Sequence, residues 1–236
     1  RNFSPPGQAF NNDGTFTHTG TAESLVNVPF TNSGIVDVQA GTFRMDADGT
    51  HAGDFQIANG AGLRFQAGTH TVESAGSISG NLVSFTGATV NIAGTYNVAN
   101  TRITAGNANF NTDTTTTLDM SGGALGGSNT VTLTGDSTWT AGPMPGSGTT
   151  IIDSGATLTI SGTSNKGIDR TLQNLGTVEY TGTNLRFALT NSPGVFDNLG
   201  VFNIDGDGDL TRNFSPPGQA FNNDGTFTHT GTAESL

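Results

Sequence analysis

The chain contains no cysteine and few charged residues. Only 11% of its 236 residues are charged, and only eight of these are lysine or arginine. Without cysteine it forms neither a disulfide framework nor a thiolate metal site. With eight basic residues and a formal net charge of −11, it lacks the basic surface that nucleic acids and anionic membranes attract. We therefore expect neither class of partner.

Long apolar runs are also missing. Hydrophobic residues make up 33% of the chain, and no run is long enough for a transmembrane helix. Disordered chains are also poorly hydrophobic, but they combine this with high charge and few aromatic residues. This chain instead has 15 phenylalanines and 35 glycines. Its abundant Val, Ile and Thr residues predict many short strands separated by Gly and Asn turns, without membrane insertion in this segment.

An identical long repeat dominates the organisation of the chain. Residues 1–25 read RNFSPPGQAFNNDGTFTHTGTAESL, and residues 212–236 have the same sequence. The offset is 212 − 1 = 211 residues. Tandem duplication explains this identity, with artificial copying of one segment as the alternative. We expect residues 1–211 to form one repeat unit and residues 212–236 to begin the next identical unit.

A shorter pattern recurs within the unit, in which a turn precedes alternating apolar and polar residues. Val36 and Val38, for example, flank Asp37, so one face of the strand is apolar. Nine occurrences precede the return of the pattern, which gives about 23 residues per coil. The residues expected on the buried face are Phe16, Val36, Val38, Leu63, Phe65, Val90, Ile92, Val131, Leu133, Leu158, Ile160, Val178, Tyr180, Phe202 and Ile204.

Further short strands are predicted at 41–45, 68–72, 94–98, 117–120 and 185–189. No segment has the spacing of an amphipathic helix. Two or three strands per coil and no helix predict an all-β fold, a parallel β-helix (β-solenoid) with about nine coils per 211-residue unit. Coils stacked about 4.8 Å apart would pair their backbone groups and close a continuous core.

Asparagine recurs at the turns in Asn-x-Gly sequences, at Asn12, Asn32, Asn174 and Asn198. Asn and Gly both tolerate the left-handed backbone of a turn, and this interpretation accounts for most of them. The alternative is a short ladder of stacked amides across adjacent coils. The sequence Pro143-Met144-Pro145 predicts a loop that leaves the coil.

This (Phe/Leu)-x-Asn-x-Gly-(Thr/Val)-(Val/Phe) coil resembles the repetitive β-helical regions of giant bacterial surface proteins. Filamentous-haemagglutinin-like adhesins and autotransporter passengers are the broad relatives. The resemblance implies an exported protein with a structural role, located outside the cell or on its surface.

Three carboxylates lie close together before the second copy, at Asp205, Asp207 and Asp209. Carboxylates spaced by two residues can converge on a hard cation such as Ca²⁺. An EF-hand loop would need Gly and Glu where Leu210 and Pro216 stand. A calcium site and a solvated acidic turn are therefore both open interpretations, and no other cofactor is expected.

The other titratable residues predict no catalytic site. The densest patch contains Asp46, Asp48, His51 and Asp54, which the surrounding Asp-Ala-Asp-Gly sequence identifies as a solvated turn. His18, His51 and His70 show no ligand spacing, and we expect them to be exposed. We expect no catalytic or cofactor-binding residues, and we expect that the chain is not an enzyme.

Three functions fit these observations. The first is a structural repeat of an extracellular filament, whose partners are neighbouring identical units stacked head to tail. The second is the stalk of a surface adhesin, for which surface glycans are a further class of partner. The third is a carbohydrate-active β-helix enzyme, against which the unchanged repetition of a whole unit argues.

Overall fold

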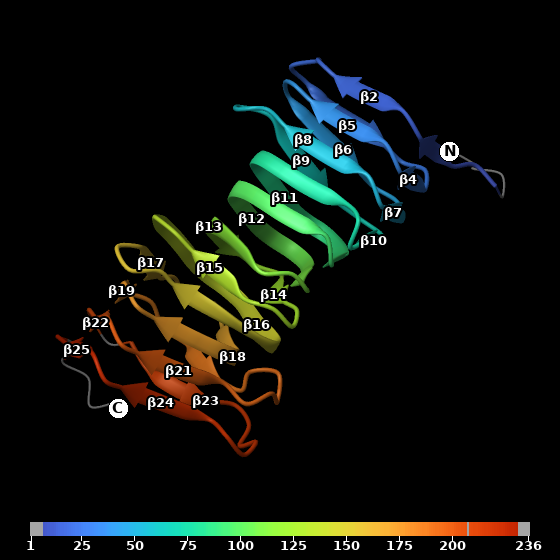
Figure 1. The fold of residues 1–236 in the computed structure, drawn as a ribbon. Helices are drawn as coiled ribbons and strands as arrows, with labels where there is room; N and C mark the ends of the chain where they lie inside the picture. The colour runs from blue at the N-terminus through green and yellow to red at the C-terminus, as the bar shows by residue number, and fades with distance from the viewer. Residues whose placement is uncertain (1–6, 207, 231–236) are drawn as a thin grey trace.

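The computed structural model describes residues 7–206 and 208–230, which form an elongated β-solenoid. The described chain winds from the N-terminal to the C-terminal end as about ten stacked turns (Figure 1). Its 25 strands pair in parallel, and no helix occurs within these residues, so none there could cross a membrane. The predicted parallel β-helix is thus confirmed.

Each turn contributes strand segments to three stacks that run along the solenoid, and long strands bend from one stack into the next. The first stack contains β1 (Phe10–Asn12), β4 (Phe30–Asn32), β7 (Gly49–His51), β10 (Thr69–Val72), the ends of β11 (Ser77–Ile92) and β12 (Thr95–Phe110), β14 (Ala124–Gly126), the middle of β16 (Asp136–Ile152), the start of β18 (Lys166–Asn174), β20 (Leu185–Phe187) and β23 (Leu210–Arg212).

The second stack begins at β2 and ends at β24. It contains β2 (Thr15–His18), β5 (Ile35–Val38), β8 (Asp54–Ile57), the starts of β11 and β12, the start of β13 (Thr114–Ser121), β15 (Val131–Leu133), the ends of β16 and β18, β21 (Val195–Asn198) and β24 (Ala220–Asn223). Between β12 and β13 the ladder is replaced by a hydrogen bond from the Thr114 hydroxyl to the Tyr96 carbonyl, 2.8 Å long.

The third stack runs without a break from β3 to β25. It contains β3 (Glu23–Val26), β6 (Thr42–Met45), β9 (Gly62–Phe65), the middles of β11 and β12, the end of β13, the start of β16, β17 (Thr157–Ile160), β19 (Thr177–Tyr180), β22 (Val201–Ile204) and β25 (Thr226–His229). Paired residues are separated by as few as 17 positions (Thr114 and Val131) and as many as 25 (Val201 and Thr226).

The number of turns is larger than the nine that the sequence pattern predicted. The pattern treated the strands at 35–38, 89–92 and 157–160 as equivalent, but these belong to the second, first and third stack respectively. It also passed over the turn that contains β10 and the start of β11. A recurring Gly-strand motif marks corners of the solenoid, and each turn has three corners, so counting motifs does not count turns.

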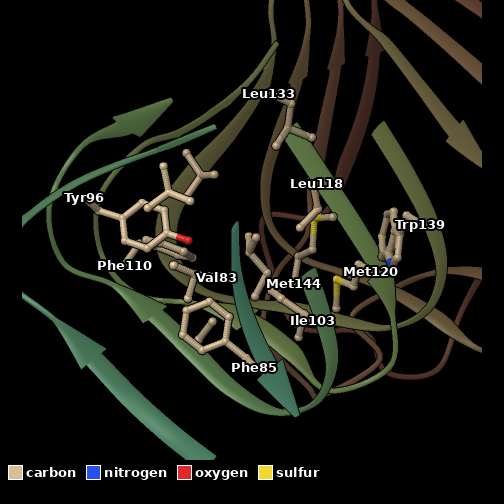
Figure 2. Packing of buried hydrophobic residues seen from close by; sticks show 14 of the residues in the cluster. Val83, Phe85, Tyr96, Ile103, Phe110, Leu118, Met120, Leu133, Trp139 and Met144 are labelled. Atoms are coloured by element: carbon tan, nitrogen blue, oxygen red, sulfur yellow. The ribbon is translucent and has the colours of Figure 1, made fainter. Parts of the chain in front are cut away.

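The core is a single apolar column inside the three stacks. Of the residues expected on the buried face, all are buried except Phe16, which is half-buried and packs against the core from the first turn. Figure 2 shows the middle of this column, where Val83 and Phe85, Ile103, Leu118 and Met120 project inward from successive turns. Each fully buried apolar side chain contributes about 1.5–3 kcal/mol.

Glycine is required at the Asn-x-Gly corners by close packing between turns. Gly34, Gly176 and Gly200 do not have positive φ angles, which contradicts the left-handed interpretation of these corners. A Cβ atom on Gly34 would instead collide with the carbonyl oxygen of Gly14 in the preceding turn. Gly53 and Gly200 would meet the carbonyl oxygens of Gly34 and Gly176 in the same way.

The prediction that Pro143-Met144-Pro145 forms an outlying loop is wrong. The three residues lie within β16, where they pair with residues 167–169 of β18, and Met144 is buried. The amide of Gly142 donates to Asn165 in the following turn, and neighbouring amides of a strand alternate in direction. Pro143 and Pro145 therefore occupy positions facing β14, where no ladder is found among the described residues and an N–H is dispensable.

Substituting a corner glycine should reduce stability in the second turn but not in the first. Gly34→Ala forces a Cβ against the backbone of the preceding turn, so we expect the free energy of unfolding to fall by about 1–3 kcal/mol. Gly14→Ala is the matched control, because no atom lies within 4 Å of its added Cβ. Urea denaturation of both variants measures the difference. Equal stability of the two would show that corner packing is not the reason for glycine.

Candidate assembly interface and buried polar sites

A ladder of asparagine side chains follows the corner between the second and third stacks at the C-terminal end. The Asn174 amide donates to Asn198 Oδ1 at 2.7 Å, and the Asn198 amide donates to Asn223 Oδ1 at 2.6 Å. Each amide also reaches a carbonyl beyond the corner, of Val201 at 2.8 Å and of Thr226 at 3.0 Å. The amide ladder, which was the alternative interpretation of these asparagines, is therefore present, and it reaches the last described turn.

A second ladder begins in the first turn, at the corner between the first and second stacks. The Asn12 amide donates to Asn32 Oδ1 at 2.7 Å and to the Ile35 carbonyl at 3.0 Å. In the third turn His51 takes the place of asparagine, since it pairs with Asn32 in the backbone register. In both ladders the amide nitrogen donates toward the C-terminal neighbour.

Aromatic side chains fill the core at the two ends where these ladders lie. At the N-terminal end, Phe10 packs on Phe30 with ring centroids 4.9 Å apart, and Phe16 packs on Phe43 at 5.1 Å. At the C-terminal end, Phe221 packs on Phe196 at 5.4 Å. Phe227 packs on Phe202 at the same distance.

The last described turn leaves part of the core uncovered. A hollow of about 590 Å³ opens between β23, β24 and β25, and its lining includes Leu210, Phe221 and Phe227. Phe221 and Phe227 are half-buried, unlike the fully buried Phe196 and Phe202 beneath them. Unpaired strand edges beside an exposed apolar surface favour the addition of further strands.

The predicted calcium ligands are only partly described. The Asp205 carboxylate accepts a hydrogen bond from the Thr230 hydroxyl at 3.1 Å, and the Asp209 carbonyl accepts one from Tyr180 at 3.2 Å. Asp207 lies outside the described residues. Within the described part of the chain no three metal-ligating side chains come together. Because this does not include Asp207, the site formed by the three aspartates stays a prediction.

The acidic patch around Asp48 does not converge on one point. Asp46 forms an ion pair with Arg44 at 2.6 Å, and Arg44 also contacts Glu23. The Asp48 carboxylate accepts the Thr69 amide at 2.7 Å. The two carboxylates thus serve separate contacts, Asp46 within its own turn and Asp48 with the following turn.

The three histidines expected at the surface, His18, His51 and His70, are instead buried, and His51 and His70 lie together in the core. His51 Nε2 lies 3.1 Å from His70 Nδ1, and His70 Nε2 lies 3.1 Å from the Ala67 carbonyl. Because a carbonyl only accepts, His70 must carry its proton on Nε2 and accept at Nδ1 from His51. This leaves His51 Nδ1 as a buried lone pair without a partner.

Burial strongly disfavours the charged form of this pair. Desolvation lowers the pKa of His51 to about 3, with a further contribution from the neighbouring His70. Burial also lowers the pKa of His70, although its hydrogen bond to Ala67 and the charge of Asp48 act in the opposite direction. The alternating strand pattern would have placed both rings inside, because His51 and His70 each lie two residues from another buried position.

Three further charged residues on β18 are buried and were not predicted. Lys166 donates to the carbonyls of Gly162 and Ser164, at 3.0 and 2.8 Å. Arg170 reaches back two turns to the Asn129 carbonyl at 2.7 Å, across Gly148, where a Cβ would collide with the guanidinium group. Burial lowers the pKa of Lys166 and Arg170 and raises that of Asp169. The Lys166 contacts therefore stay within one corner of the solenoid, whereas the Arg170 contact connects turns that lie two apart.

An open polar groove of about 580 Å³ follows the third stack across the middle turns. Its lining consists of Asn81, Leu82, Asn100, Thr101, Arg102, Thr117, Leu118, Asp119, Asp136 and Thr138. The Arg102 guanidinium pairs with the Asp119 carboxylate at 2.9 Å, and the Thr138 hydroxyl donates to the same carboxylate at 3.1 Å. The groove offers hydroxyl, amide and carboxylate groups to a polar ligand.

Comparison of the chain with protein-family models, with curated proteins and with solved structures finds no match. The resemblance to haemagglutinin-like adhesins and autotransporter passengers therefore stays a prediction from the coil motif.

Acidification should destabilise the fold through the histidine pair. The unfolded chain takes up a proton near pH 6.5, whereas folded His51 does so only near pH 3, so stability is full above pH 6.5 and falls below it. We expect a loss of about 1.4 kcal/mol per pH unit for each histidine held neutral. Urea denaturation between pH 7.5 and about 5, above the usual range of carboxyl groups, measures this slope.

The variant His51→Asn removes the titrating group and places asparagine where the N-terminal ladder would continue. It should unfold with a clearly shallower pH dependence than the unchanged chain. The same slope in both proteins would contradict the assignment of acid sensitivity to His51.

Proposed function

We propose that this chain is a structural repeat of an extracellular filament, built from solenoid units that join head to tail. The observation that carries the proposal is the pair of identical segments at opposite ends of the solenoid. Residues 220–223 repeat residues 9–12, and residues 226–229 repeat residues 15–18. One copy packs against the turn that follows it, and the other packs against the turn that precedes it.

Head-to-tail joining would satisfy the uncovered end of the solenoid. A turn buries its inner face and pairs its backbone only when it has a neighbour on both sides. The last described turn has a neighbour on one side and carries half-buried Phe221 and Phe227. A further unit of the same sequence brings the apolar side chains that cover them.

The composition supports a location outside the cell or on its surface. The chain is stabilised by repetition, with no cysteine and few charged residues, as the coil motif of bacterial surface proteins would imply. The buried Arg170 connects turns that lie two apart, which supports a structural role for this residue over a catalytic one. Neighbouring units of the same sequence are the proposed partners.

The stalk of a surface adhesin is the alternative function. The polar groove over Asn81, Asn100 and Asp119 favours it, because amide, hydroxyl and carboxylate groups in adjacent turns suit the hydroxyl groups of glycans. A stalk and a filament share the same repeating architecture. They differ in whether the protein binds glycans, either through this groove or through a distinct tip.

Chains of one, two and three units test the filament proposal. Electron microscopy should show thin particles whose length grows by about 50 Å per unit, since each turn rises about 4.8 Å. The one-unit chain is the control for particle width. Compact particles whose longest dimension does not grow with the number of units would contradict a filament.

A further inference from the structure

The two copies of the repeated segment lie in different stacks of the same solenoid. β1 lies in the first stack, whereas its copy β24 lies in the second. β2 lies in the second stack, whereas its copy β25 lies in the third. β25 belongs to the third stack because backbone pairing connects it to β3 through every intermediate turn of that stack.

The repeat unit is therefore not a whole number of turns. From β3 in the first turn to β25 in the eleventh, the third stack makes ten steps. Because β25 repeats β2 and not β3, one unit spans ten turns plus one of three stacks. A unit of 211 residues thus covers ten and a third turns, and the copy is displaced along the axis and advanced by one stack. The identity of residues 1–25 and 212–236 by itself predicts the same coil displaced along one axis, and the backbone register corrects this prediction by adding the advance of one stack.

The asparagine ladders fit the addition of a further turn beyond the last described turn. Asn223 is the copy of Asn12, and it accepts a hydrogen bond from Asn198 at 2.6 Å. Asn12 in turn donates to Asn32 at 2.7 Å. The two contacts use different atoms of the same residue, an acceptor oxygen and a donor nitrogen, so one asparagine can make both at once. The two ladders would then join into one.

The aromatic side chains of the core independently support the addition of a further turn. In the first turn Phe10 and Phe16 contact Phe30 and Phe43 of the following turn. Their copies Phe221 and Phe227 contact residues of the preceding turn and border the hollow of about 590 Å³. The turn that follows in a further unit would bring its own Phe30 and Phe43 to this hollow.

We infer that the exposed side of β24 and β25 receives the turn of residues 26–45 from a further unit of the same sequence. The resulting joint is a continuous solenoid in which each unit is advanced by one stack relative to the unit before it. This inference rests on the proposed filament and specifies its joint. Three units, not one, restore the original orientation, after an axial distance of about 150 Å at a rise of about 4.8 Å per turn.

The advance of each unit by one stack affects both the bending and the surface of the filament. A bend of the unit toward one side points in a different direction in each of three successive units, so the filament stays straight on average. Each surface feature, such as the ion pairs of Glu23 with Arg44 and Arg64, recurs on three sides in turn. Neighbouring filaments therefore meet the same surface from any side.

Disulfide formation between introduced cysteines can show which strands are paired at the joint, because the chain has no cysteine of its own. The test uses a chain in which residues 26–236 follow residues 1–236, giving a second unit. Asn11 of the first turn pairs with Thr31 of the second turn, and all the chosen positions are exposed. One variant carries Asn222→Cys with Thr31→Cys of the second unit, which are paired if the unit advances by one stack. The rival variant carries Thr211→Cys with the same second-unit cysteine, which are paired if the unit keeps its stack.

We expect the Asn222 variant to form its disulfide under mild oxidation as fast as a control with Asn11→Cys and Thr31→Cys in the first unit. The Thr211 variant should react at least about tenfold more slowly, because cysteines with Cα atoms more than ~7 Å apart cannot bridge without backbone movement. A faster Thr211 variant would overturn the advance by one stack. Slow reaction of both, with the control intact, would overturn the continuous joint. Separate solenoids could then still form a filament, so particle length tests the proposed function independently.

Discussion

Parallel pairing of each turn with the turns on either side is the interaction on which the whole structure depends. It places residue over residue, so that asparagine can bond to asparagine and phenylalanine can pack on phenylalanine. A single turn has neither a core nor backbone partners of its own, and its stability comes from its neighbours. The unusual composition follows from this, because few charges and many small residues suffice when packing repeats along one axis.

Close stacking also explains the residues at the corners. Glycine at positions such as Gly34 leaves room for the carbonyl of the preceding turn, and Asn32 satisfies buried polar groups where the chain bends. Where His51 replaces asparagine, it forms a pair with His70, and elsewhere Arg170 reaches over two turns. The histidine pair ties two turns together at the cost of desolvation, so we expect it to make the fold sensitive to acid.

Much of the fold could be predicted from the sequence, because the alternation of Val36, Asp37 and Val38 and of similar strands fixes the buried face. The number of turns could not, because corners of all three stacks share the same Gly-strand motif. Burial of His70 and Lys166 was missed because polar residue types predict exposure, whereas the strand period placed them inside. The identity of residues 1–25 and 212–236 revealed the repeat, but only backbone register shows that the copies occupy different stacks.

The central claim is that one segment can be both the last turn of a unit and the first turn of the next. Amide hydrogen exchange over residues 220–229 tests this most directly, since amides at an unpaired strand edge exchange fast and paired amides exchange slowly. In the chain of two units, these amides should become as protected as those of residues 195–204 in the preceding turn. Unchanged fast exchange at residues 220–229 after addition of the second unit would contradict the claim.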